Sequence, residues 1–170
     1  NVYGINLATG YDGTVTQGAV NMSIGAGGYA QAAGTFTGGG VATDTVTIAG
    51  DFTKTGGTFS NYKTTLVFPS GNHAIASNST LSLLGLDNSG STTLGPSVII
   101  FGTGASFYNR VGATLSVASS KTLQVYADYV ATRCLYAGEF SGSGSFILFA
   151  SADASVDLSS ATISCAANIK

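Results

Sequence analysis

Short apolar runs alternate with clusters of Gly, Ser and Asn along most of this chain. The runs are rich in Val, Ile, Leu, Phe and Thr, a composition typical of strands. No long window carries apolar residues at the three- and four-residue spacing of an amphipathic helix. The pattern therefore predicts an all-β protein, with strands inside the ranges 45–52, 64–70, 80–86, 97–103, 114–120, 122–128, 145–151 and 154–160.

The predicted strands are of two kinds. Some alternate strictly, as at Val46 and Ile48. Others, at 98–101 and 146–149, are apolar at every position, which indicates strands buried on both sides. Such strands lie in the centre of a domain or are covered, in an assembly, by a neighbouring subunit.

Short sequence motifs return along the chain. Periodic self-similarity is the signature of a solenoid, in which each turn hides its apolar face by stacking on the next. We therefore predict a short β-solenoid, and a β-sandwich or jelly roll with strand exchange remains the alternative because it fits the strand number as well. The motifs are Thr-Leu at 80, 114 and 122, GTF at 34–36 and 57–59, and the pair FGTGASF (101–107) and FSGSGSF (140–146).

Residues 51–125 carry a longer series of motifs, which resembles the degenerate repeats of large bacterial surface proteins. The resemblance implies a right-handed β-helix used for display, adhesion or surface coating, and it brings no catalytic residues with it. The matching pieces, in order, are Phe52, GTF at 57–59, LVF at 66–68, GNHAI at 71–75, NSG at 88–90 and TLSV at 114–117.

Residues 1–44 differ from the predicted core domain, 45–170, in being richer in Gly and weaker in strand signals. Gly loses much backbone entropy on folding, so we expect a Gly-rich N-terminal arm that is held by its own domain or by the sheet edge of a neighbouring copy. The apolar residues expected to insert at such a joint are Val2, Ile5, Leu7, Val15, Val20, Met22 and Ile24.

Charge is scarce, since 8% of the residues are Asp, Glu, Lys or Arg against roughly a quarter in an average soluble domain. The net charge of −2 leaves no basic face for phosphates, which argues against nucleic-acid binding. No apolar run is long enough for a membrane-spanning helix. Low charge and small residues favour an exported protein, extracellular or at the cell surface.

The residues that carry chemistry are scattered. His73 is the only His, and nothing near it in sequence supplies a nucleophile or a carboxylate, so we interpret it as a surface turn or buried structural His. The Asp residues and the single Glu139 fit turns better than the carboxylate pair of a glycosidase. We therefore predict that the chain is not an enzyme. The enzyme alternative is a polysaccharide lyase in which Asp128, Arg110, Arg133 and Lys121 converge from neighbouring coils.

Three further features concern covalent chemistry and ions. Cys134 and Cys165 are candidates for a disulfide that closes a loop of about 30 residues, and two free thiols are the alternative. Asn21 and Asn78 begin glycosylation sequons. The stretch 87–90, Asp-Asn-Ser-Gly, offers oxygen ligands for Ca²⁺ but lacks the spacing of an EF-hand, so we interpret it as a turn. No metal or cofactor is predicted.

These features favour a structural subunit of an extracellular fibre or surface layer, in which copies of the chain join through strand edges and apolar contacts. The alternative is a carbohydrate-binding or adhesive surface module. Its exposed Tyr side chains, Tyr126, Tyr129 and Tyr136, would stack on surface glycans.

Overall fold

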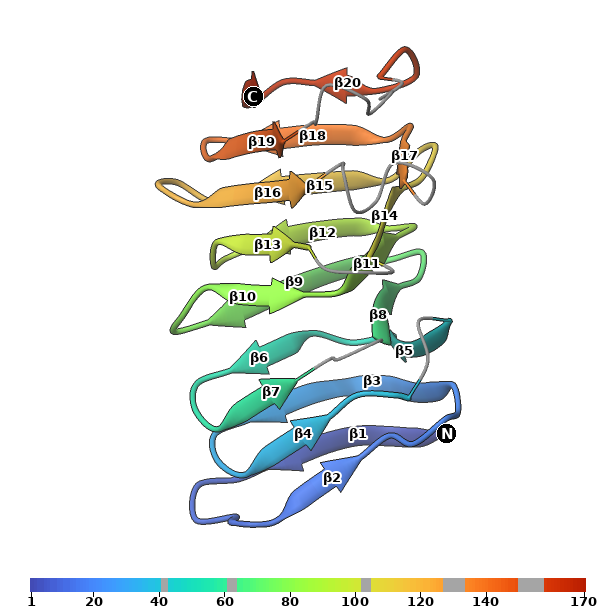
Figure 1. Ribbon diagram of the computed structural model, residues 1–170, viewed down its shortest axis with the longest axis vertical. Coiled ribbons are helices and arrows are strands. Elements are labelled where there is room, and N and C mark those ends of the chain that lie inside the picture. The colour runs from blue at the N-terminus through green and yellow to red at the C-terminus, as the bar shows by residue number, and fades with distance from the viewer. Residues whose placement is uncertain (41–42, 61–63, 102–104, 127–133, 150–157) are drawn as a thin grey trace.

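The chain winds into a β-solenoid of about six turns (Figure 1). The computed structural model describes all residues except 41–42, 61–63, 102–104, 127–133 and 150–157, and the described part contains strands and no helix. Every strand pair in that part is parallel. The predicted solenoid is confirmed. The β-sandwich alternative is wrong, because hairpin-connected sheets pair antiparallel.

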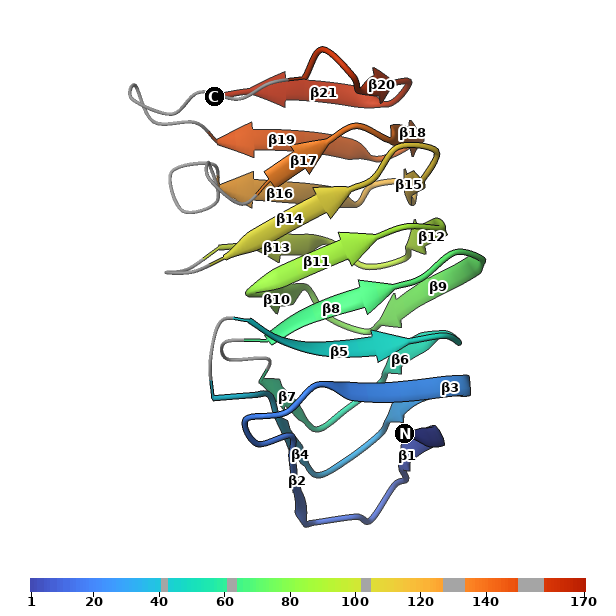
Figure 2. The ribbon, with the colours of Figure 1, turned by 90° about the vertical axis from the view of Figure 1, so that its right-hand side faces the viewer.

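Three sheet faces run along the solenoid axis, as the two side views show (Figures 1 and 2). We name them by one central strand each. The β8 face contains β5 (Asp44–Ile48), β8 (Thr64–Phe68), β11 (Gly85–Asn88), β14 (Ser106–Asn109) and β17 (Cys134–Tyr136). The β9 face contains β1 (Val2–Leu7), β6 (Phe52–Lys54), β9 (Asn72–Ser77), β12 (Ser91–Leu94), β15 (Thr114–Val117), β18 (Glu139–Gly142) and β20 (Thr162–Ile163).

The third face is divided into two sheets. Its N-terminal sheet contains β2 (Thr14–Thr16), β4 (Thr35–Thr37) and β7 (Thr58–Ser60). Its C-terminal sheet, which gives the β10 face its name, contains β10 (Leu81–Leu83), β13 (Val98–Ile100), β16 (Thr122–Tyr126), β19 (Ser145–Phe149) and β21 (Ala166–Ile169). The strand range expected at 154–160 falls largely outside the described residues.

Strand β3 (Met22–Gln31) belongs to two faces at once, since its first part pairs with β5 and its last part with β6. The chain turns the corner between them at Gly-rich residues. Gly28 has a φ of 67°, and a Cβ there would lie 2.4 Å from the carbonyl oxygen of Asp51. This corner explains part of the high Gly content of the N-terminal region, because no other residue fits this backbone without strain.

The N-terminal residues form the first coils of the same solenoid. Leu7 and Ile24 are buried in the chain's own core, and Ile5, Val15 and Met22 pack against that core. Leu7 and Ile24 are therefore not free to insert into a neighbour, contrary to the expectation of an arm. Of the seven proposed arm residues, Val2 and Val20 are exposed.

Inside the solenoid, apolar side chains stack coil upon coil. The ring of Tyr29 lies parallel to that of Phe52 at 5.0 Å, and Phe36 stacks in the same way on Phe59 at 5.1 Å. In the strands that are apolar at every position, only the inward residues are fully buried. On the outside of the β10 face, Phe101 is 48% exposed, and it begins an aromatic column that continues through Tyr126 to Phe149.

Two asparagines stand in the core where the β8 face turns toward the β9 face. Asn88 and Asn109 occupy one register position, and both are fully buried. The amide of Asn88 donates to the Asn109 Oδ1 at 3.0 Å and lies within 3.1 Å of the carbonyl oxygens of Gly90 and Thr114. Its Oδ1 accepts from the Thr92 hydroxyl at 2.8 Å. These bonds offset the cost of burying an amide.

We expect Asn88→Ala to lower the free energy of unfolding by about 1–3 kcal/mol, because buried partners of Asn88 lose their hydrogen bonds. Urea denaturation followed by circular dichroism measures the change. Asn72→Ala, at an exposed position of β9, serves as the control, with an expected effect within about 0.5 kcal/mol. Equal effects of the two substitutions would contradict a structural role for the buried amide.

Candidate functional site

A shallow groove of about 300 Å³ crosses the outward surface of the β8 face. Because alternate residues of a strand point to opposite sides of the sheet, the outward residues of β5, β8, β11 and β14 meet there although they are far apart in the sequence. The groove is lined by Thr43, Thr45, Thr65, Val67, Asp87, Ser106 and Tyr108.

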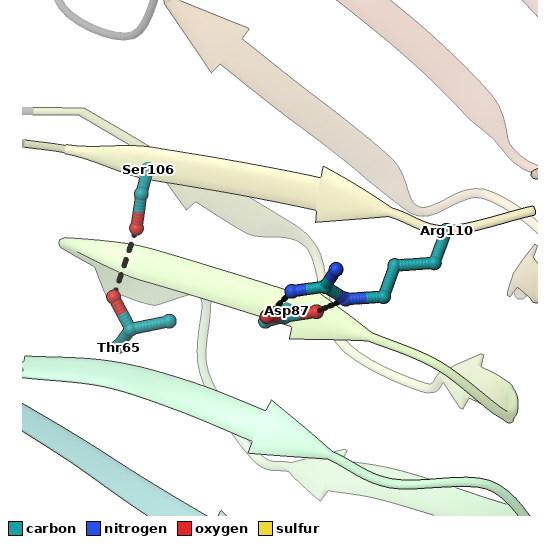
Figure 3. Close-up of polar contacts among 4 residues, drawn as sticks. All are labelled: Thr65, Asp87, Ser106 and Arg110. Atoms are coloured by element: carbon teal, nitrogen blue, oxygen red, sulfur yellow. Dashed lines mark hydrogen bonds and ion pairs between the residues drawn. The ribbon is translucent and has the colours of Figure 1, made fainter. Parts of the chain in front are cut away.

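The floor of the groove is a notch over Gly85. Gly85 lies in register between Thr65 and Ser106, and it has no side chain to separate them. The two hydroxyl groups therefore reach across it and hydrogen-bond at 2.8 Å, with either oxygen able to donate (Figure 3). A Cβ on Gly85 would lie 2.3 Å from the Thr65 hydroxyl oxygen and 2.6 Å from that of Ser106.

An ion pair lies beside the notch, along β11 (Figure 3). Arg110 donates from Nε to the Asp87 Oδ1 at 2.6 Å and from Nη2 to the Oδ2 at 2.5 Å. The hydrogen bonding of Arg110 to the Asp87 carboxylate raises the pKa of Arg110, and the guanidinium carbon lies 5.4 Å from the centre of the Tyr108 ring. The Asp87 side chain is 13% exposed and that of Arg110 is 48% exposed, so the guanidinium remains accessible from solvent.

The groove therefore combines hydroxyl groups that donate and accept, a neutralised pair of charges, and the apolar surface of Val67 and Tyr108. Such groups orient a polar ligand by hydrogen bonds. Within the described part of the chain, no group of three or more His, Cys, Asp or Glu side chains is arranged to hold a metal ion.

His73 lies inside the solenoid, in strand β9, and is 5% exposed. Its Nδ1 is 3.1 Å from the carbonyl oxygen of Gly50, and its Nε2 is 2.8 Å from that of Pro69. Of the two interpretations from sequence, the buried structural histidine is correct. The ring links one coil to the next and lies at 54° to the ring of Phe68, with the ring centres 5.5 Å apart.

The structure separates two other sets that the sequence placed together. In the stretch 87–90, Asp87 points outward to Arg110 and Asn88 points into the core, so the two do not form one cation site. Of the proposed lyase residues, Arg110 is paired with Asp87, and Asp128 and Arg133 lie outside the described residues.

The predicted sugar-stacking tyrosines also differ from expectation. Tyr136 is 2% exposed, so the expectation that it is accessible is wrong. Tyr126 stacks on Phe149 with ring centres 4.5 Å apart, and Tyr129 is not among the described residues. Sequence reasoning missed Tyr108 and the Asp87–Arg110 pair. The signal that could have found them is the coil offset of 20 or 21 residues, which aligns Thr65, Gly85 and Ser106.

The candidates for modification lie at the surface or near it. Cys165 is a free thiol, half-buried, so the predicted disulfide to Cys134 is not formed; of Cys134 only the backbone is described. Asn21 is exposed and accepts a hydrogen bond from the Thr45 N–H, and Asn78 is exposed and donates to the Thr55 carbonyl oxygen. Use of either sequon stays a prediction.

Comparisons with known protein families, with curated proteins and with solved structures find no match to this chain. In the described residues, no helix is long and apolar enough to cross a membrane. The class that the fold defines is therefore a parallel β-solenoid, and its function has to be argued from its own surfaces.

We expect the Cys165 thiol to react slowly at neutral pH, because burial raises its pKa more than its backbone hydrogen bonds lower it, and the thiolate is the nucleophile. In a Cys134→Ser variant, the rate of alkylation by iodoacetamide should be below that of free cysteine at pH 7. The rate should still rise at pH values where free cysteine has reached its plateau. A plateau at the same pH as free cysteine would contradict this expectation.

Proposed function

We propose that this chain is a structural segment of an extracellular fibre or surface layer, joined to its neighbours by continuation of its β-ladders. The observation that carries the proposal is the open strand edge at each end of the solenoid. Strand β1 pairs only with β3, and β21 pairs only with β19, among the strands of the described residues. Unpaired edges of this kind are templates for further strands.

The backbone of β21 presents donors at its outer edge. The N–H of Lys170 donates to the carbonyl oxygen of Leu148 in β19. Since successive residues of a strand direct their backbone groups to opposite sides, Ala167 and Ile169 direct theirs away from β19. These groups are positioned to pair with one more parallel strand.

The side chains of the last coil are consistent with such an addition. Ile169 continues the inward column of Leu148, and Ile163 continues that of Phe140. Leu148 and Phe140 are fully buried, whereas Ile169 is 63% exposed and Ile163 is 38% exposed. A further coil would cover both isoleucines and remove apolar surface from water.

The same edges can pair with a further coil whether that coil belongs to a longer polypeptide or to another copy of this chain. Copies that stack head to tail make a heterologous contact, which generates a filament when the rotation does not close. The apolar core would then run through the whole assembly, because each coil is covered only by its neighbours. An extracellular location fits the low charge content of the chain and is part of the proposal.

We expect the purified chain to form filaments that are visible by negative-stain electron microscopy, and Ala167→Pro to abolish them. Proline removes an N–H from the open edge and is tolerated in edge strands, so the thermal unfolding midpoint should change little. Ala167→Val keeps this N–H and should leave filaments intact.

Sedimentation velocity over a range of concentrations gives the same comparison in solution. The proposal fails if the unmodified chain stays monomeric at every concentration, or if the proline variant assembles as well as the valine variant.

A further inference from the structure

We propose that the groove on the β8 face binds a short stretch of a neutral glycan chain. This activity goes beyond the proposed structural role, because the groove lies on the side of the solenoid and the joints lie at its ends. The class of ligand follows from the side chains that line the groove and from the pairing of the backbone groups beneath it.

The strands beneath the groove cannot bind a ligand through their backbone groups. The backbone groups of β5, β8, β11 and β14 are engaged in the parallel ladders between neighbouring coils. An extended peptide binds a sheet chiefly by adding a strand to a free edge, and the groove lies on a sheet face, away from any edge. The ligand is therefore read by side chains alone.

The side chains on offer suit hydroxyl groups. Thr45, Thr65 and Ser106 each carry a hydroxyl, which donates one hydrogen bond and accepts others, as the hydroxyl groups of a sugar do. The bond between Thr65 and Ser106 uses one of their two hydroxyl hydrogens and leaves the other for a ligand, and the two residues are 8% and 6% exposed. The missing side chain of Gly85 lets these two hydroxyl groups meet and fill the space above it.

Charge in the groove selects against an anionic ligand. Asp87 and Arg110 neutralise each other through two hydrogen bonds, so a uronate or sulfate would have to compete with a carboxylate already in place. Val67 and Tyr108 supply the apolar surface on which the C–H groups of a sugar ring rest. The volume of about 300 Å³ lies at the lower limit of ligand sites, which suits part of a polymer.

The aromatic column on the β10 face is a weaker candidate for sugar binding. Tyr126 and Phe149 lie within 9° of parallel, so they cover the ring faces that they turn toward each other. Lys170 lies 5.9 Å from the ring centre of Phe149. The ring surfaces between Tyr126 and Phe149 are thus unavailable to a sugar, whereas the Tyr108 ring, with the Arg110 guanidinium 5.4 Å from its centre, stacks on no other ring among the described residues.

Isothermal titration calorimetry with cellohexaose, maltohexaose and mannohexaose tests the proposal, with hexagalacturonate as the anionic probe and a hexapeptide of Gly and Ser as the peptide probe. We expect at least one neutral hexasaccharide to bind more tightly than both other probes. Thr65→Val and Tyr108→Ala should each lower its affinity at least tenfold.

Matched controls on other surfaces are Thr93→Val, at an exposed position of β12, and Tyr3→Ala, whose side chain is 79% exposed. Both should leave affinity within twofold. All four variants change outward side chains, and circular dichroism reports whether each keeps the fold.

The proposal is overturned if no neutral hexasaccharide binds in the millimolar range, if the anionic or peptide probe binds more tightly, or if groove and control variants behave alike. Sedimentation of the same samples records assembly separately. If the chain polymerises but binds no sugar, only the proposed glycan site is contradicted. If it stays monomeric but binds sugar, only the proposed structural role is contradicted.

Discussion

The parallel backbone ladder between successive coils is the constraint on which the rest of this structure depends. It fixes neighbouring coils about 4.7–4.9 Å apart, and it places equivalent residues of each coil directly above one another. No coil can bury its apolar residues alone, so stability arises from the stack. Side chains at equivalent positions of successive coils must therefore pack against one another, because they are the nearest neighbours along the solenoid axis.

This requirement explains which polar groups enter the core. The column that contains Phe68, Asn88, Asn109 and Tyr136 changes from apolar to amide and back again. One asparagine alone would leave its amide without a partner in the ladder direction. Two in succession bond to each other, and their amide groups also donate to the carbonyl oxygens of Gly90, Thr114 and Glu139, so the pair is satisfied as a unit. The buried His73 ring is likewise paired with a group of a neighbouring coil, since one of its partners is the carbonyl oxygen of Gly50 in the preceding coil.

The architecture was predictable from sequence because strand length, Gly-rich turns and repeated motifs are local properties. The register was not, since coils differ in length: the offset is 20 residues from Thr65 to Gly85 but 23 from Phe52 to Ile75. The candidate site depends on register, so its members were missed. The lyase alternative grouped Arg110 with Asp128, Arg133 and Lys121, whereas the ladder brings Arg110 to Asp87, one coil earlier. The N-terminal region was misjudged for a related reason, because Gly at a corner and Gly in a loose arm look alike in composition.

The same ladder separates the two surfaces on which function is proposed. Along the sides of the solenoid the backbone is already paired, so specificity there has to come from side chains, and a single small residue such as Gly85 is enough to bring the side chains of its two neighbours together. At the C-terminal end the inward residues Ile163 and Ile169 are exposed, so the proposed assembly would need little sequence specificity there beyond apolar residues of matching register. A change at Tyr108 should therefore alter the proposed groove and leave the proposed joint intact, whereas a change at Ala167 should do the reverse. Because the fold keeps these surfaces apart, the residues of the groove could change without disturbing the proposed assembly, provided that the inward columns and the corner glycines are maintained.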